Sequence, residues 1–273
     1  MRDGQMVGRH VEHVMGTVFS IDVRDPVSFA AVDGVVEWLH WVDDTVSTYQ
    51  DDSEICRLDR GEISLEDCCD EVVDIMARCA MLERRSGGAF SAHAGGRIDP
   101  SGLVKGWSID VAAGMLTAAG SSRHAVNGGG DVRVVGRPEP GRAWQIGVAD
   151  PLTPGGLATV VSVVDAAVAT SGTAERGLHV VDPTSGEMAT ELASVTVVGP
   201  DLGLADAYAT AAMVKGRHAR TWLEEQLGYE AFAVTAEGVR WRTSGFDRWA
   251  APFTANSQPG HSPAPAWWAT IPS

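Results

Sequence analysis

The chain has 273 residues, 44% of them hydrophobic, and its 36 acidic and 21 basic side chains give a formal net charge of −15. This composition is that of a globular protein, and the negative charge would repel the phosphates of a nucleic acid, which we therefore exclude as a partner. There is no apolar run of about 18 residues that could span a membrane, and the first residues lack the apolar core of a secretion signal. We expect a cytoplasmic protein with no membrane span.

Four cysteines lie in the first third of the chain, at positions 56, 68, 69 and 79. Two of them are adjacent, and the spacing suits neither a zinc site nor a disulfide framework. We therefore expect reduced thiols.

The first half of the chain predicts one strand followed by three amphipathic helices, because alternation in FSIDV gives way to apolar residues at helical spacing. The second helix would begin at a cap formed by Ser64 and end at Gly87. The strand is expected at 19–23 and the helices at about 28–46, 64–86 and 102–119.

The second half predicts a twisted sheet, because short β-branched runs are separated by glycine, proline and aspartate. Two short helices at 205–214 and 219–227 and a final hairpin at 231–243 complete the folded part. The expected strands lie within 124–136, 144–150, 157–170, 178–183 and 192–200.

The last residues differ in composition from the rest of the chain. Residues 247–273 are rich in Pro, Ala, Ser and Trp without periodicity, so we expect one domain at 1–246 and a flexible tail at 247–273. The alternative is that Trp267 and Trp268 dock on the domain.

The strongest local motif is Ala-Asp-Ala-Tyr-Ala-Thr at 205–210, in a segment predicted to be helical. A spacing of four places the Asp206 carboxylate and the Thr210 hydroxyl one turn apart on one face, where two hard oxygens can share a cation such as Mg²⁺. The alternative is an acidic residue near a helix N-terminus, beside a Thr that hydrogen-bonds to the main chain. Two oxygens alone do not decide for a metal site.

A second motif, IDPSGLVKG at 98–106, is a turn that leads into a helix. Free amide groups at the helix start, a glycine at 102 and Lys105 in the first turns suit a bound phosphate. The spacing matches neither the Walker loop nor the dinucleotide fingerprint. The alternative is a capped helix with a solvent-facing lysine.

A third candidate combines Thr170-Ser171-Gly172 with His179, which follows seven residues later. An imidazole at a strand edge near a phosphate-facing loop could accept a proton from an incoming alcohol. The alternative is an ordinary surface histidine. A serine hydrolase is disfavoured because the chain has no GxSxG motif.

Two glycine-containing turns complete the set of candidates. The run from Asn127 to Asp131 contains three glycines, and Met15-Gly16-Thr17 precedes the first predicted strand. Glycine permits positive φ and a close ligand approach, but a plain tight turn has the same composition.

Taken in order, these segments resemble the FAD:protein FMN transferase family, also called the ApbE family, over most of the chain. Several ordered motifs are far more specific than any one of them. The resemblance lies in MGTVFSIDV, STYQDDSEICRLDR, SGGAF, IDPSGLVKGW, VNGGGDV, IGVADP, ATSGTAERGLHVVDPTSG and SVTVVGPDLGLADAYATAA.

The resemblance implies an enzyme that uses Mg²⁺, with Mn²⁺ as an alternative, to move FMN from FAD onto a Thr or Ser hydroxyl of an acceptor flavoprotein, with release of AMP. It implies that Asp206 and Thr210 bind the metal together with the main-chain carbonyl of Gly102. The catalytic residues implied are His179, beside the reacting phosphate, and Asp206. The FAD contacts implied by position are Met15, Thr17, Tyr49, Ala89, Phe90, Ser91, Asp99, Lys105 at the pyrophosphate, Asp131, Ser171, His179 and Val180.

The chain departs from the family pattern in three places. Ser91 stands where the family usually has an Asp, so one polar contact to the adenosine part is expected to differ. Gly172 is followed by Thr-Ala-Glu where family members often have a Tyr, and the stretch from Phe90 to Asp99 is short, which should remove a loop near the nucleotide.

We expect an α+β fold of mainly antiparallel sheets with packed helices, in two interlocked lobes with a nucleotide cleft between them. Two other functions stay open at this point. An FAD pyrophosphatase would use water in place of the protein hydroxyl at the same metal site. A flavin-binding protein without turnover is disfavoured by the presence of Lys105, His179, Asp206 and Thr210.

Overall fold

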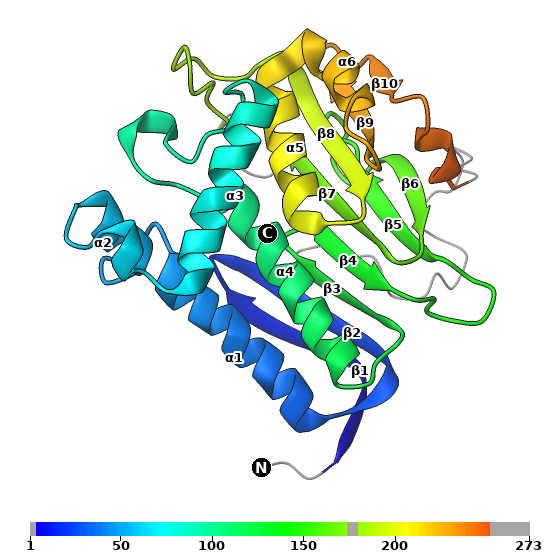
Figure 1. Cartoon of the computed structure of the whole chain (residues 1–273). Helices are drawn as coiled ribbons and strands as arrows, with labels where there is room; N and C mark the ends of the chain where they lie inside the picture. The colour runs from blue at the N-terminus through cyan, green and yellow to red at the C-terminus, as the bar shows by residue number, and fades with distance from the viewer. Residues whose placement is uncertain (1–3, 174–179, 252–273) are drawn as a thin grey trace.

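The computed structural model describes residues 4–173 and 180–251. Its main feature is one continuous antiparallel sheet of eight strands in the order β1-β2-β3-β4-β7-β8-β9-β10 (Figure 1). The strands are β1 (Gln5–Val14), β2 (Thr17–Ser28), β3 (His124–Gly128), β4 (Asp131–Val135), β7 (Ala166–Gly172), β8 (Leu192–Gly199), β9 (Glu230–Thr235) and β10 (Arg240–Arg242). The expected α+β class with mainly antiparallel sheet is confirmed, and the division into two lobes with a nucleotide cleft stays a prediction.

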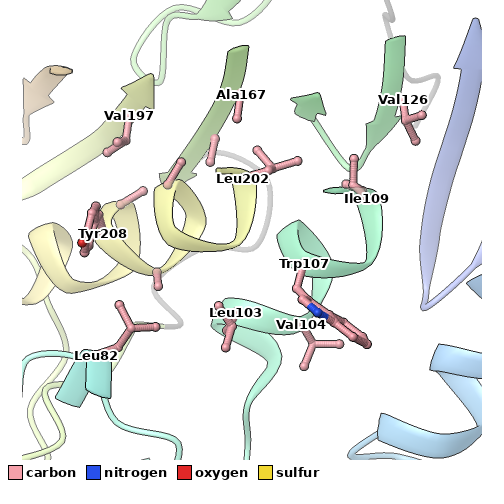
Figure 2. Packing of buried hydrophobic residues seen from close by; sticks show 14 of the residues in the cluster. Leu82, Leu103, Val104, Trp107, Ile109, Val126, Ala167, Val197, Leu202 and Tyr208 are labelled. Atoms are coloured by element: carbon pink, nitrogen blue, oxygen red, sulfur yellow. The ribbon is translucent and has the colours of Figure 1, made fainter. Parts of the chain in front are cut away.

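Helices cover one face of this sheet (Figure 1). Their buried side chains form one apolar cluster with inward residues of the strands, and Figure 2 shows Leu103 and Trp107 of α4 and Tyr208 of α5 within it. The helices are α1 (Phe29–Val46), α2 (Glu54–Asp59), α3 (Asp70–Ser86), α4 (Ser101–Ala118), α5 (Leu202–Lys215) and α6 (Ala219–Glu224).

The opposite face is covered by a separate two-stranded sheet, β5 (Trp144–Ala149) and β6 (Leu157–Val163). Side chains of this pair, including Trp144 and Val161, form a second apolar cluster with Val168 and Phe232 of the main sheet. The middle of the main sheet is therefore buried on both faces, as in β8, whereas alternate residues of the edge strand β1 are exposed.

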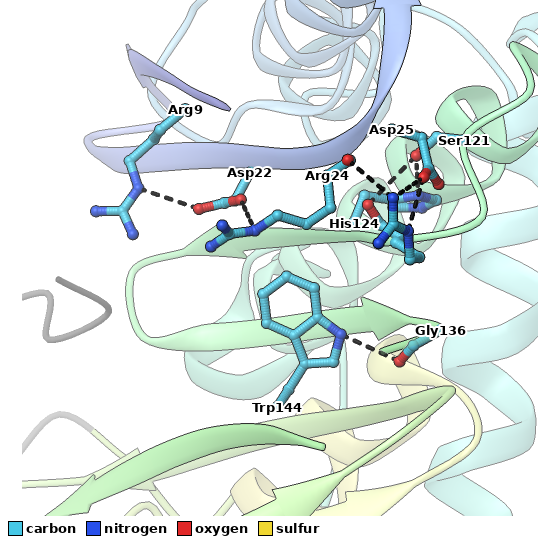
Figure 3. A network of polar contacts seen from close by, with 9 residues as sticks. Arg9, Asp22, Arg24, Asp25, Ser121, His124, Gly136 and Trp144 are labelled. Carbon is cyan, nitrogen blue, oxygen red and sulfur yellow. Dashed lines mark hydrogen bonds and ion pairs between the residues drawn. The ribbon is translucent and has the colours of Figure 1, made fainter. Parts of the chain in front are cut away.

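A buried polar network joins the first strands to this second layer (Figure 3). Asp22 of β2 is 7% exposed and lies 2.9 Å from Nε of Arg24 and 3.6 Å from Nε of Arg9. The Arg24 guanidinium lies over the ring of Trp144, whose indole N–H donates to the carbonyl oxygen of Gly136 at 3.1 Å.

Most predicted helix limits are confirmed by local capping. The Ser28 hydroxyl accepts from the amide of Ala31 at the start of α1, and Gly87 ends α3 with a φ of 64°. The single helix predicted from Ser64 is wrong, because Ser64 and Asp67 instead cap a 3₁₀ turn, Leu65–Asp67. Cys69 is extended, and its amide donates to the Glu54 carboxylate at 2.9 Å, so α3 begins only at Asp70.

Three expectations about strands are corrected. The run at 157–170 contains two strands joined by a turn, and β1 was not predicted, whereas the turn between two strands at 124–136 is confirmed. In the run at 178–183, the described residues form no strand: Val181 makes an isolated bridge to Met188. Asp182 closes a tight loop there, accepting from the amide of Thr184 at 2.8 Å.

The chain beyond the expected domain boundary at 246 contacts β6 over its described residues. The carbonyl of Trp249 accepts from the amide of Ser162 at 2.7 Å, and the amide of Ala251 donates to Val160 at 2.9 Å. The division into a domain at 1–246 and a flexible tail stays a prediction. Within residues 4–173 and 180–251, no helix combines the length and apolarity needed to cross a bilayer.

Candidate active site

The candidate site is built on the pair α4 and α5, which run in opposite directions against each other (Figure 2). They approach each other closely at Gly106, which faces Leu202 and Gly203. A methyl group added at Gly106 would lie 2.5 Å from the carbonyl oxygen of Leu202 and 2.9 Å from Cα of Gly203. No side chain larger than hydrogen fits there, so glycine at 106 permits the contact between the helices.

The crossing places Lys105 of α4 between two buried carboxylates. The Lys105 ammonium forms an ion pair with Asp131, the first residue of β4, and its Nζ lies 3.7 Å from Oδ2 of Asp206 on α5. Asp131 is fully buried and also accepts from the amide of Thr170 at 2.9 Å. The alternative of a solvent-facing lysine is wrong, because the Lys105 side chain is 22% exposed and held by acids from two other elements.

Asp206 lies deeper in its helix than the sequence predicted. α5 begins at Leu202, because the Asp201 carboxylate caps it and accepts from the amide of Leu204 at 2.7 Å. Asp206 is therefore in the second turn and is 4% exposed. The alternative of an acidic residue at the helix N-terminus is wrong.

Thr210 lies one turn after Asp206, among other oxygen atoms. Its hydroxyl is 3.2 Å from that of Ser171 at the end of β7. A methyl group added at Gly102 would lie 3.7 Å from the same Thr210 oxygen, so the start of α4 faces this hydroxyl. The three residues expected at the metal, Gly102, Asp206 and Thr210, thus come from two helices held side by side.

These groups fit a hard divalent cation. Mg²⁺ prefers oxygen ligands and is commonly held by one or two carboxylates together with substrate phosphates. No group of three or more His, Cys, Asp or Glu residues that could hold a metal occurs within 4–173 and 180–251. A cation at this site would therefore also use hydroxyl and main-chain oxygens, which Thr210 and Gly102 offer.

The predicted nucleotide contacts at 89–99 lie in the connection between α3 and α4. The Phe90 ring packs there, since its Cε2 would be 3.1 Å from a methyl group added at Gly102, and Ala89 is buried beside it in sequence. Ser91 donates to Oε1 of Glu83 at 3.2 Å. Asp99 is exposed and accepts from the amide of Ser101 at 2.9 Å, at the entry to the helix.

The two glycine-containing turns also lie together. A methyl group at Gly129, whose φ is +56°, would lie 3.0 Å from the Thr17 hydroxyl, so Thr17 lies against the turn that leads into Asp131. Met15 has a φ of 52°, unusual for a residue with a side chain, and its amide donates to the Asp43 carboxylate at 3.2 Å. Backbone strain of this kind is concentrated at functional sites.

Three predicted residues are not brought into this cluster by any described contact. Tyr49 is 95% exposed in the connection after α1. Val180 is buried in the core, and its carbonyl accepts from the amide of Ala189 at 2.9 Å. His179 lies outside the described residues, so its place beside the phosphate stays a prediction.

With this geometry in place, comparison with known proteins gives the family. The family model described as "ApbE family" matches residues 15–95 and 91–233, which is most of the chain. The chain belongs to the ApbE family.

Relatives in this family carry one common name. A protein of Vibrio cholerae named FAD:protein FMN transferase is 33% identical over 129 residues, covering 44% of this chain and 39% of that protein. One of Rhodobacter capsulatus with the same name is 32% identical over 151 residues, covering 52% of this chain and 29% of that protein. The matches therefore span less than half the length of these curated relatives.

Solved structures of the family share the fold over nearly the whole chain. The flavin transferase ApbE of Vibrio cholerae superposes with a TM-score of 0.79 at 21% identity, covering 90% of this chain and 99% of that one. The ApbE protein of Thermotoga maritima gives a TM-score of 0.76 at 20% identity, covering 90% and 100%. Both likenesses establish the fold.

The structure adds residues that the sequence did not single out. Asp110 of α4 bonds to the start of α5, and Glu83 of α3 holds Ser91. A signal for Asp110 was present: it is the lone charged residue in the run from Gly106 to Leu116. Glu83 gave no such signal, because charged residues are ordinary near the end of an exposed helix.

Proposed function

We propose that this chain is an FAD:protein FMN transferase, which moves FMN from FAD to a Thr or Ser hydroxyl of an acceptor protein and releases AMP. The carrying observation is the α4–α5 pair, which gathers Gly102, Lys105, Asp206 and Thr210 from two distant motifs around the buried Asp131. Family membership and the common name of the relatives support the same activity.

Charge neutralisation and positioning are the main demands of phosphoryl transfer. Asp206, Thr210 and the Gly102 carbonyl would hold Mg²⁺, with Mn²⁺ as an alternative, and the bound ion would neutralise charge on the pyrophosphate. Lys105 would bind the same pyrophosphate. Asp131 orients Lys105 for this, because an ion pair with a fully buried carboxylate restricts the ammonium to one side of α4.

The acceptor hydroxyl must lose its proton as the new phosphoester forms. We assign this step to His179, which would accept the proton at an imidazole nitrogen, since histidine is the side chain whose ordinary pKa suits a base near neutral pH. The remaining residues proposed to contact FAD are Met15, Thr17, Tyr49, Ala89, Phe90, Ser91, Asp99, Asp131, Ser171 and Val180.

The test is incubation of the purified chain with FAD, Mg²⁺ and a candidate acceptor protein, followed by chromatography of AMP and FMN and by the mass of the intact acceptor. We expect AMP release together with an acceptor heavier by one FMN less water, and loss of both with chelator. AMP with free FMN on an unmodified acceptor would instead identify the pyrophosphatase. Absence of AMP for several acceptors and both metals would contradict enzymatic activity. The cytoplasmic location stays a prediction.

A further inference from the structure

Asp110, in the middle of α4, contacts the first turn of α5. Its Oδ2 accepts from the amide of Leu202 at 2.6 Å and from the amide of Gly203 at 3.2 Å. These amides belong to the free N–H groups that any helix leaves at its N-terminus. A carboxylate of α4 thus accepts hydrogen bonds from free amides at the start of α5. This contact lies on the opposite side of the Gly106 crossing from Gly102 and Thr210.

The same strand supports both ends of this arrangement. Asp131 and Arg133 of β4 point to the helix face, two residues apart, and each pairs with an opposite charge of α4. Asp131 holds Lys105, and Nε of Arg133 lies 3.7 Å from Oδ1 of Asp110. Arg133 also donates to the carbonyl of Pro200, just before α5. α4 is therefore tied to both β4 and α5 at two positions.

The negative charge of Asp110 lowers the stability of the folded protein, because it is buried and lies near a second carboxylate. Burial, and next the nearby Asp201 carboxylate, raise the pKa of Asp110 to about 6, against the opposing effects of Arg133 and the two amides. The pKa of the Tyr229 hydroxyl is also raised, mainly by burial, and the negative charges of Asp201 and Asp110 contribute to the increase. Since Asp201 already caps α5, a cap alone does not explain a buried second acid.

We propose that Asp110 is a positioning residue: by tying the first turn of α5 to α4, it fixes Asp206 and Thr210 relative to Lys105 and Gly102. This inference rests on the proposed function, because the placement matters only if these residues bind a cation and a pyrophosphate. Groups that orient metal ligands without touching the ion commonly change metal affinity by about 10-fold to 100-fold when altered.

The test compares Asp110→Asn with Asp201→Asn in the full chain. Both changes remove one carboxylate near the start of α5. Asp201 caps its own helix by accepting from Leu204, whereas Asp110 of α4 accepts from Leu202 of the other helix. An Asn side chain keeps one carbonyl oxygen that can face both amides as Oδ2 does, but it is neutral and its NH₂ group would face Arg133 in place of Oδ1. The Asp110→Asn change therefore weakens both amide bonds and removes the pairing with Arg133. Mn²⁺ affinity in the presence of FAD is measured by electron paramagnetic resonance, and stability by urea unfolding at pH 8.

For Asp110→Asn we expect the Mn²⁺ dissociation constant to rise about tenfold, with little change in stability, because removal of the unfavourable buried charge offsets the lost pairing with Arg133. For Asp201→Asn we expect the reverse: lower stability and Mn²⁺ affinity within about twofold. Equal loss of affinity in both variants, or affinity that falls only in step with stability, would overturn the proposal.

Two further variants keep the outcomes separate. Asp206→Ala should abolish Mn²⁺ binding; if the wild-type chain binds no Mn²⁺, or if Asp206→Ala binds it as well as wild type, the proposed metal site fails before the role of Asp110 is tested. Gly106→Ala should repeat the loss of Mn²⁺ affinity by forcing the helices apart, without altering any charge. Unchanged affinity in a folded Gly106→Ala protein would contradict the dependence on helix placement.

Discussion

Asp22 and Asp131 are both buried carboxylates of the same sheet, yet their partners differ. Asp22 pairs with Arg24, two residues along β2, and with Arg9, its register partner on β1 (Figure 3). Asp131 pairs with Lys105 from a helix that precedes it in the chain, and Lys105 also faces Asp206 from a third element.

The difference separates a structural ion cluster from a candidate ligand site. Around Asp22, two guanidinium groups from neighbouring positions surround one carboxylate, and burial still raises the pKa of Asp22. Around Lys105, two carboxylates face one ammonium next to hydroxyl oxygens, which suits a second, incoming cation. The ion pairs of Asp22 join neighbouring strand positions and support the sheet. The ion pairs of Lys105 join distant elements and form a candidate ligand site.

The largest effect is expected for Asp206→Ala, which removes the carboxylate proposed to bind the metal. FMN transfer should fall by about 10³-fold or more while the protein stays folded. Thr210→Val should act in the same direction but less strongly, because a neutral hydroxyl contributes less to a hard cation. Steady-state transfer at limiting Mg²⁺ and circular dichroism measure the two effects, and unaltered turnover would remove the metal assignment.

The next largest effect is expected for His179→Ala. If His179 accepts the proton, transfer should slow by roughly 10²-fold to 10⁴-fold while FAD affinity falls only modestly. Single-turnover transfer at saturating FAD, measured between about pH 5.5 and 9, tests this. Recovery of the full rate with an unchanged pH profile would assign His179 to binding and not to catalysis.

A smaller effect, on stability alone, is expected at the structural cluster. Asp22→Asn should lower the free energy of unfolding by about 1–3 kcal/mol, because the guanidinium partners lose the negative charge that they pair with. FMN transfer should stay within about twofold of wild type. The matched change Asp131→Asn should lower transfer as well as stability. If Asp22→Asn reduced transfer as much as Asp131→Asn, the contrast between the two clusters would be wrong.

The smallest effect concerns His124, which is fully buried between the Ser121 hydroxyl and the Ala113 carbonyl. Burial lowers its pKa below the usual 6.5, so the folded state disfavours the proton. The stability that depends on neutral His124 is complete above the unfolded pKa and is lost as the pH falls below about 6.5. His124→Gln should flatten this dependence in thermal melts between about pH 5 and 7; an identical slope in both proteins would exclude it.

The local parts of the fold could be predicted because their signals are short in sequence. Ser28 and Gly87 cap helices through bonds to near neighbours. β1 was not predicted because its half-buried positions include His10 and Glu12, whose side chains are hydrogen-bonded to each other and interrupt an apolar stripe. The strand predicted at 178–183 was wrong for its described residues, because β-branched residues favour a strand only where a partner strand exists.

The candidate site divides in the same way. The spacing of Asp206 and Thr210 on one helix face was visible in the sequence. The position of Lys105 between Asp131 and Asp206, and the bonds from Asp110 to α5, could not be seen there, because they depend on how two helices cross. Resemblance to a family supplied roles, but not this arrangement.

The crossing at Gly106 also limits how the chain can evolve. Every other genetically encoded residue carries a β-carbon, and at this position that atom would overlap the Leu202 carbonyl. Selection should therefore act against any substitution of Gly106, so that α4 and α5 keep the same packing arrangement during evolution.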